Sequence, residues 1–195
     1  MKKINLPGIR IVTISGRIAS GATTLANNLA KELGWKHIEG GEIIWKASEI
    51  AKAGGCAKDT HKRPDVKDRQ FEDYQKQLLK TENNLVIETK LSGFCAQGID
   101  GVFKILVVAN DKHGKDQPGI RIDRLVNREK STIKEAKDEI LHREKHDLEK
   151  WRRMYANNNP KWVYWDEKYY DLVINTFEFD REKVLDIALK AINLK

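Results

Sequence analysis

The sequence has few of the features that mark secreted or membrane-bound proteins. Its two cysteines, Cys56 and Cys95, lie far apart and form no C-x-x-C pair, which is typical of reduced thiols in the cytosol. No run approaches the roughly 20 apolar residues that a membrane span requires, and the first residues contain no apolar stretch of signal length. We therefore expect a cytoplasmic protein that does not contact a membrane.

The common patterns for covalent or zinc-dependent catalysis are also missing. No Ser/His/Asp or Cys/His arrangement is visible in the sequence. His142 and His146 lie about one helical turn apart, but the residues between them do not give the H-E-x-x-H pattern, and Arg143 and Lys145 surround them with positive charge. We find no internal repeat and no low-complexity segment. A metal site at these histidines is therefore not expected.

The composition describes one globular domain with a basic surface. A chain of 195 residues is long enough for a single domain with a real core, and 40% hydrophobic with 33% charged residues is typical of a soluble protein. The net charge of +7 favours an anionic partner. Nucleotide phosphates and nucleic acid both qualify, although many basic proteins only have a solvated basic surface.

One stretch near the start has the order strand, glycine loop, helix. A β-branched run over 11–14 leads to Gly16, and helical spacing begins at Thr23. Against the phosphate-binding pattern G-x-x-x-x-G-K-[ST], Gly16 and Gly21 match the glycines and Thr23 matches the hydroxyl residue that binds Mg²⁺. Backbone N–H groups of such a loop and the helix N-terminus can bind phosphate. The lysine position, however, is occupied by Ala22.

Strands and helices alternate along the rest of the chain. Apolar runs predict strands over 9–15, 35–39, 85–88, 103–109 and 172–175, and helical spacing predicts helices over 23–33, 42–53, 65–80, 120–128, 132–154 and 181–192. Gly40-Gly41 is interpreted as a turn, and the polar stretch 54–64 has no clear period. The first strand, helix and strand form a right-handed βαβ unit. We therefore expect one α/β domain of three layers with a parallel sheet.

Several charged residues are candidates for phosphate or metal binding. Glu88 ends a buried strand, where an acid is unusual, so it either holds Mg²⁺ or is an ordinary strand-end acid. Arg121, Arg124 and Arg128 share a helix face that could clamp phosphates bidentately or form surface ion pairs. The segment Asp68-Arg69-Gln70 is typical, taken alone, of a solvated helix face.

Two further segments allow a functional and a structural interpretation. The densely charged helix over 132–154 carries Arg143, Lys145, Arg152 and Arg153, and it could either close over a reacting nucleotide or be a merely soluble helix. The aromatic residues over 162–170 could stack on bases, although packing of a loop against the domain is the commoner explanation.

The motifs together carry a resemblance that covers the chain from its first strand to its last helix. They are Ile14-Ser15-Gly16, Ser20-Gly21, Thr23-Thr24, Gly41-Glu42-Ile43, Asp68-Arg69-Gln70, Val86-Ile87-Glu88, Lys90-Leu91-Ser92-Gly93, Arg124, Arg128-Glu129, Arg143-Glu144 and the stretch 170–176. In this combination the chain resembles the compact, archaeal-type cytidylate kinases, a branch of the P-loop nucleoside monophosphate kinases.

The resemblance implies an architecture and a reaction. The expected fold is a three-layer α/β P-loop kinase domain over 1–195 with a five-stranded parallel sheet, a helical insertion over 40–82 that binds the nucleoside monophosphate (NMP), and a helical lid over 129–160. The implied reaction moves the γ-phosphate of ATP, bound with Mg²⁺, to a monophosphate, with CMP or dCMP favoured. The expected partners are these nucleotides and not nucleic acid, and the protein is expected to be a monomer or a homodimer.

The resemblance also implies roles for individual residues. ATP would be bound by Gly16, Arg17, Ser20, Gly21, Ala22, Thr23, Thr24 and Arg124. Mg²⁺ would be bound at Thr23 and Glu88. The acceptor phosphate and the transferring group would be bound by Arg69, Lys90, Arg128 and Arg143. Lys90 stands where the family usually has an arginine, and Trp45, next to Lys46, replaces the arginine of the family's G-E/D-I-x-R motif.

Ala22 leaves two interpretations open. Either the protein is a degenerate nucleotide binder without catalysis, or other arginines supply the missing charge, because electrostatic stabilisation depends on where charge lies rather than on which position delivers it. Candidates for that second case are Arg17, Arg124, Arg128 and Arg143. The intact loop, with the other acidic and basic motifs, favours a working kinase. A basic nucleic-acid-binding module is the alternative from another class, and the location of the basic residues would distinguish the two.

Overall fold

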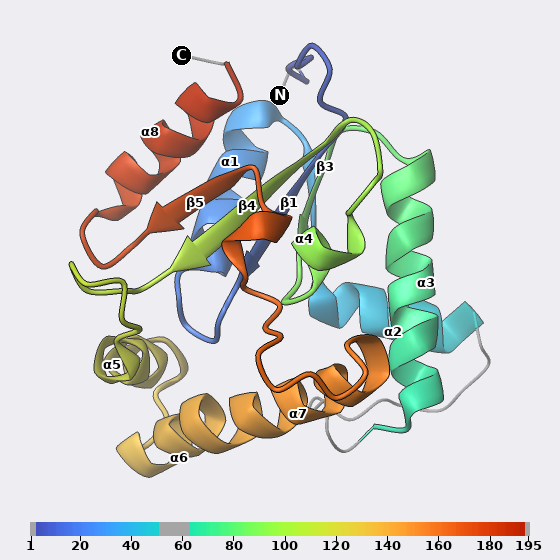
Figure 1. Ribbon diagram of the computed structural model, residues 1–195. Coiled ribbons are helices and arrows are strands. Elements are labelled where there is room, and N and C mark those ends of the chain that lie inside the picture. The colour runs from blue at the N-terminus through green and yellow to red at the C-terminus, as the bar shows by residue number, and fades with distance from the viewer. Residues whose placement is uncertain (1–2, 51–62, 194–195) are drawn as a thin grey trace.

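The computed structural model describes residues 3–50 and 63–193 (Figure 1). Cys56, the end of the helix predicted over 42–53 and most of the stretch 54–64 lie outside these residues. The elements are, in order, β1 (Ile11–Gly16), α1 (Ala22–Leu33), β2 (Lys36–Glu39), α2 (Gly40–Ile50), α3 (Asp65–Thr81), β3 (Leu85–Glu88), α4 (Ser92–Cys95), β4 (Val102–Val108), α5 (Pro118–Glu129), α6 (Ile133–Lys137), the π-helix η2 (Asp138–Arg143), α7 (Glu144–Tyr155), the 3₁₀ turn η3 (Glu167–Tyr169), β5 (Leu172–Asn175) and α8 (Arg181–Ala191).

The centre of the fold is a five-stranded sheet with the order β2-β3-β1-β4-β5, and every neighbouring pair is parallel. Helices α1 and α8 pack on one face, and α3 and α4 lie toward the other (Figure 1). All six residues of β1 are buried, as expected for a parallel strand covered on both faces. The predicted three-layer α/β architecture is confirmed.

The sequence of helix α1 explains which of its faces is buried and where the helix ends. Its apolar residues Leu25, Leu29 and Leu33 recur every four positions and are at most 2% exposed, so one helix face is buried against the sheet. Gly34 ends the helix at a φ of 64°, a left-handed conformation that glycine adopts without strain. The helix therefore begins at the end of β1 and runs back along the sheet.

The structure corrects three details of the prediction. Gly40 and Gly41 are not a turn but the first residues of α2, where burial of Ile43 holds the helix directly against the end of β2. The short helix α4 was not predicted, because its four residues are too few to show a helical period. The helix predicted over 132–154 is continuous but passes through the π-helix η2 between α6 and α7.

Helix α3 is not a solvated charged helix, because it buries part of its polar face. Asp68 is 1% exposed and pairs with Arg63 at 2.7 Å and with Lys150 of α7. Arg153 of α7 also pairs with Asp65 at the start of α3. These ion pairs fasten α3 to α7, and the interpretation of the segment around Asp68 as a solvated face is wrong for Asp68 itself.

No helix within residues 3–50 and 63–193 is long and apolar enough to cross a membrane.

The buried acid Glu72 on α3 predicts a pH dependence of stability. Burial, reinforced by Asp68, raises the pKa of Glu72 to about 7 from an ordinary value of 4.5. The unfolded chain therefore loses this proton at lower pH than the folded chain, and the free energy of unfolding falls as the pH rises from about 5 to about 7. The glutamine side chain of Glu72→Gln cannot ionise. Over this pH range the free energy of unfolding of the variant should therefore fall by about 2–3 kcal/mol less than that of the wild type.

The measurement is urea unfolding of the wild type and of Glu72→Gln at intervals between pH 5 and pH 8. The two curves should diverge, with the variant gaining stability relative to the wild type toward pH 8. Parallel curves over this range would show that Glu72 is not held protonated by its surroundings.

Candidate active site

The loop between β1 and α1 depends on its two glycines. A Cβ on Gly16 would lie 2.3 Å from the Ser20 hydroxyl and 2.9 Å from the backbone oxygen of Val107. Gly21 has a φ of +107°, a conformation that side chains rarely adopt, and it faces Thr176 closely. The matches of both glycines to the phosphate-binding pattern therefore have a physical reason in the structure.

The start of α1 is left open toward the loop. Gly21 provides no side-chain cap, and the first turn contains no acidic residue, so its backbone N–H groups are available to a ligand. The Ser20 hydroxyl beside it is fully buried and has no hydrogen-bond partner. An orphaned hydroxyl, an uncapped helix and a glycine cradle fit a phosphate group that would accept these hydrogen bonds.

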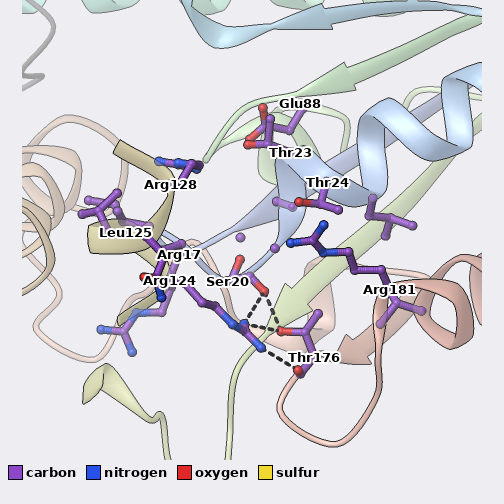
Figure 2. A pocket seen from close by; sticks show the side chains of 18 of the residues that line it. Arg17, Ser20, Thr23, Thr24, Glu88, Arg124, Leu125, Arg128, Thr176 and Arg181 are labelled. Atoms are coloured by element: carbon purple, nitrogen blue, oxygen red, sulfur yellow. Dashed lines mark hydrogen bonds between the residues drawn. The ribbon is translucent and has the colours of Figure 1, made fainter. Parts of the chain in front are cut away.

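A cavity of about 1090 Å³ lies over this loop. It is lined by the loop, the end of β3, one side of α5, parts of η2 and the start of α8 (Figure 2). Of the residues predicted for the site, those that line the cavity are Gly16, Arg17, Ser20, Gly21, Ala22, Thr23, Thr24, Glu88, Lys90, Arg124, Arg128 and Arg143. The tertiary structure thus gathers residues from widely separated parts of the sequence at the carboxyl edge of the sheet, where ligands of such folds bind.

Thr23 and Glu88 lie side by side on one wall of the cavity (Figure 2). Burial and the neighbouring Glu39 raise the pKa of Glu88 to about 7, while the Thr23 hydroxyl and the charge of Arg128 oppose the shift. A hydroxyl and a carboxylate are oxygen ligands that suit Mg²⁺. No group of three or more His, Cys, Asp or Glu side chains within the described ranges could hold a metal ion, so a cation here would need oxygens from a bound phosphate and water.

Two arginines near the loop are neutralised by a buried ion cluster. Arg121, fully buried, pairs with Asp116 at 2.9 Å and with Glu144 at 3.2 Å. Arg17 pairs with the same carboxylates at 2.9 and 2.7 Å and stacks on Trp165. Burial alone would raise the pKa of Glu144, but Arg17 and Arg121 keep it below its usual value. The interpretation of Arg121 as a phosphate clamp is therefore wrong, because Asp116 and Glu144 compensate its charge inside the fold.

Arg124 braces the loop against the end of β5. It donates to the backbone oxygen of Ser20 at 3.3 Å and to both oxygens of Thr176 at 2.7 and 2.8 Å (Figure 2). The Thr176 hydroxyl itself donates to Ser20 at 2.6 Å. Burial and the charge of Arg181 lower the pKa of Arg124. The guanidinium lies in the cavity wall with part of its donors already used.

Two further cations that line the cavity, Arg143 and Lys90, are paired with carboxylates of the helical segment 129–160. Arg143 pairs with Glu139, and Lys90 donates to Asp147 at 2.9 Å. Asp147 is fully buried, so Lys90 fastens the end of β3 to α7. Arg69, in contrast, is exposed on α3 and does not line the cavity. The structure therefore brings Lys90 to the predicted site but not Arg69.

The aromatic residues after α7 have a structural role. Trp162 is 8% exposed, Tyr164 is fully buried, and the Tyr164 ring packs edge-on against Trp151 and Trp165. The commoner explanation, a loop packed on the domain, is confirmed for these two residues, which are not available to stack on bases.

Arg181 is a cavity residue that the sequence did not indicate. It begins α8, directly after the loop that leaves β5, and it lines the cavity together with Phe179 and Thr176. One signal was present in principle: all parallel strands end at the same edge of the sheet, so a residue shortly after the last strand lies near the glycine loop.

The chain is similar over nearly its whole length to curated cytidylate kinases. It is 30% identical over 188 residues to a cytidylate kinase from Archaeoglobus fulgidus, covering 94% of this chain and 95% of the relative. It is 32% identical over 192 residues to a cytidylate kinase from Thermococcus kodakarensis, covering 95% of this chain and 89% of the relative. No protein-family model matches the chain.

Solved structures support the fold independently of sequence. An uncharacterised protein from Eubacterium ventriosum superposes with a TM-score of 0.64 at 19% identity, covering 95% of this chain and 99% of that one. A shikimate kinase from Bacteroides thetaiotaomicron superposes with a TM-score of 0.59 at 14% identity, with the same coverage. At such identities the likeness concerns the fold alone.

The buried ion cluster predicts a large loss of stability from one substitution. Glu144→Ala would leave the guanidinium groups of Arg17 and Arg121 facing each other with one carboxylate fewer, which should lower the free energy of unfolding by about 3–5 kcal/mol. Glu149→Ala on the same helix is the matched control, because its pairing with Lys145 at 3.9 Å is exposed and its loss should cost under about 1 kcal/mol.

Chemical denaturation of both variants at neutral pH measures the difference. Equal, small losses in the two variants would mean that the buried cluster does not hold α7 to the loop.

Proposed function

The chain belongs to the cytidylate kinase family, and on this premise we propose that it transfers the γ-phosphate of ATP to CMP or dCMP, producing ADP and the nucleoside diphosphate. The observation that carries the proposal is the composition of one cavity. It combines the glycine loop, the Thr23–Glu88 pair and cations from several elements. Phosphoryl transfer needs positioning and positive charge more than covalent chemistry, and this cavity offers both.

The loop residues bind the donor in this proposal. Backbone N–H groups around Gly16 and Gly21, with the open start of α1, hold the phosphates of ATP, and the buried Ser20 hydroxyl gains its missing partner there. Thr23 and Glu88 hold Mg²⁺, which when bound neutralises phosphate charge and orients the phosphates. Arg128 of α5 and Arg143 of η2 supply further positive charge to the cavity.

The acceptor side requires α3 to move. Lys90 already lines the cavity, but Arg69 lies outside it on α3. We propose that both cations bind the acceptor phosphate once α3 closes toward the loop. Because Glu144 and Asp147 already hold α7 to the loop and to the end of β3, α3 would move relative to α7. The ion pairs of Asp65 and Asp68 with α7 would then have to rearrange. Such a closure also excludes water from the transferring phosphate.

The two alternative functions are less well supported. A nucleic-acid-binding module is disfavoured because Arg124, Arg128 and Arg143 line the cavity at the glycine loop, and because Trp162 and Tyr164 are buried. A degenerate nucleotide binder would have no chemical need for Glu88 next to Thr23. The proposed reaction uses nucleotides of the cytoplasm, and we place the enzyme there.

The test of the proposed function is a screen for ADP release. Purified protein with ATP and Mg²⁺ is offered CMP, dCMP, UMP, AMP, GMP and dTMP in turn, with ATP alone as the blank. CMP and dCMP should give the highest kcat/KM. Turnover of none of the six, together with activity that appears only in Ala22→Lys, would establish the degenerate nucleotide binder instead.

The acceptor role of Arg69 and Lys90 gives a prediction for kinetics. Arg69→Ala should lower kcat/KM for CMP by about 2–4 kcal/mol, roughly 30- to 1000-fold, because a charged hydrogen bond near the transferring group is lost. The KM for ATP should change little, since Arg69 lies outside the donor cavity. Lys90→Ala should act in the same direction.

Lys80→Ala serves as the control on α3. Lys80 is exposed in the last turn of that helix, about three turns beyond Arg69, so its loss removes the same charge without touching the acceptor. Unchanged turnover of CMP in Arg69→Ala would remove Arg69 from the site.

A further inference from the structure

The glycine loop lacks its own cation, so another residue has to provide it. A lysine at position 22 would reach the β- and γ-phosphates of the donor, but Ala22 is apolar and 6% exposed. The neighbouring Arg17 shares two carboxylates with Arg121, and Arg124 is bound to Ser20 and Thr176. Arg17, Arg121 and Arg124 are therefore committed to the fold in whole or in part, and Arg128 on α5 pairs with its neighbour Glu129 at 2.8 Å.

Arg181 differs from them. It lines the same cavity, it is exposed, and within residues 3–50 and 63–193 it makes no hydrogen bond or ion pair with another side chain. Its side chain extends from the start of α8 toward Thr24 in the first turn of α1, above Thr176 (Figure 2). The guanidinium thus points into the space in front of the open helix start.

The backbone that carries Arg181 is fixed in place. Thr176 is hydrogen-bonded to Ser20 at 2.6 Å and, through its backbone N–H, to Val108 at 2.9 Å. Asp180 caps α8 by accepting from the backbone N–H of Lys183 at 2.8 Å. Arg181 therefore stands on the first position of a capped helix whose preceding loop is bound to the glycine loop itself.

The neighbouring positive charges of Arg181 and Arg124 favour the binding of an anion in the cavity. Arg181 is close enough to Arg124 that its charge adds to the effect of burial in lowering the pKa of Arg124. Two cations that face a shared cavity repel each other until a negative ligand lies between them. Asp180 and Glu182 flank Arg181 in the sequence and line the cavity, yet neither pairs with its guanidinium.

We propose that Arg181 binds the β- and γ-phosphates of the donor nucleotide and replaces the loop lysine that Ala22 lacks. A guanidinium can hold two phosphate oxygens at once. From the start of α8, Arg181 approaches the loop from a different side than Arg128 does (Figure 2). The identity of the donor as ATP rests on the proposed function. The contact itself requires only a nucleotide with at least two phosphates.

The first test is nucleotide affinity, which does not depend on turnover. Dissociation constants of ATP, ADP and AMP are measured by calorimetry for the wild type and Arg181→Ala. The variant should bind ATP and ADP roughly 10- to 100-fold more weakly and AMP less than about 3-fold more weakly, because only the first two carry a β-phosphate. Equal weakening of all three would assign Arg181 to the base, ribose or α-phosphate and overturn the proposal.

The matched control for affinity is Lys183→Ala. Lys183 lies two residues further on the same helix, carries the same charge and does not line the cavity. It should leave all three affinities within about 2-fold of the wild type, since a charge outside the cavity is largely screened. A loss of ATP affinity equal to that of Arg181→Ala would attribute the effect to net charge and not to a contact.

The second test restores the missing lysine. Ala22→Lys should recover most of the ATP affinity that Arg181→Ala loses, and it should change the affinity of the wild type little, because the two cations serve the same phosphates. The same gain in both backgrounds would show that the two positions act independently and overturn the replacement. If the wild type phosphorylates no monophosphate, the proposed function fails, while the ratio of ATP to AMP affinity still decides the role of Arg181.

Discussion

The close approach of backbone segments at Gly16 determines the rest of the site. With no Cβ at this position, β1 ends against Val107 of β4, and the chain turns back so that Ser20 lies over the end of the strand. Gly21 then starts α1 without a capping side chain and with space for Thr176 beside it. Any larger residue at either glycine would push the loop away from the sheet, and the open helix start would no longer face the cavity.

The charges of the cavity divide into those that build it and those that remain for a ligand. Arg17 and Arg121 belong to the first group, because Asp116 and Glu144 neutralise them inside the fold. The pair of Arg17 with Glu144 also ties α7 to the glycine loop, so both are positioned by the same contact. Arg181 belongs to the second group. Its side chain reaches the cavity from the start of α8, and the segment before this helix is bound to the glycine loop through Thr176.

The connection between α3 and α7 is continuous with the ion cluster at the glycine loop. Buried Asp68 of α3 pairs with Lys150 of α7, and Glu144 at the start of α7 pairs with Arg17 of the loop at 2.7 Å. Arg69, next to Asp68, is exposed. Buried charges therefore connect α3, α7 and the loop in one network, and Arg69 lies outside it.

The patterns in the sequence were sufficient to predict a parallel sheet, the succession of strands and helices along the chain, and the glycine loop, because each depends on local regularities. The buried run at 11–14, the leucines of α1 and the glycines at 16 and 21 are constrained by their neighbours in the chain or by the sheet they cover. The same holds for Glu88 beside Thr23, since parallel strands end at one edge. The expectation for Lys90, in contrast, came only from the family resemblance.

The assignment of each arginine could not be made from the sequence. Arg121, Arg124 and Arg128 share one face of α5, yet their roles differ. Arg121 is buried between carboxylates, Arg124 lines the cavity while it braces Thr176, and Arg128 lines the cavity without such a contact. Arg181 belongs to none of the sequence motifs described above. A cation is structural or functional according to which carboxylates and carbonyls lie within about 3 Å of it, and those partners come from elements that are distant in the chain and meet only after the sheet and its helices have packed.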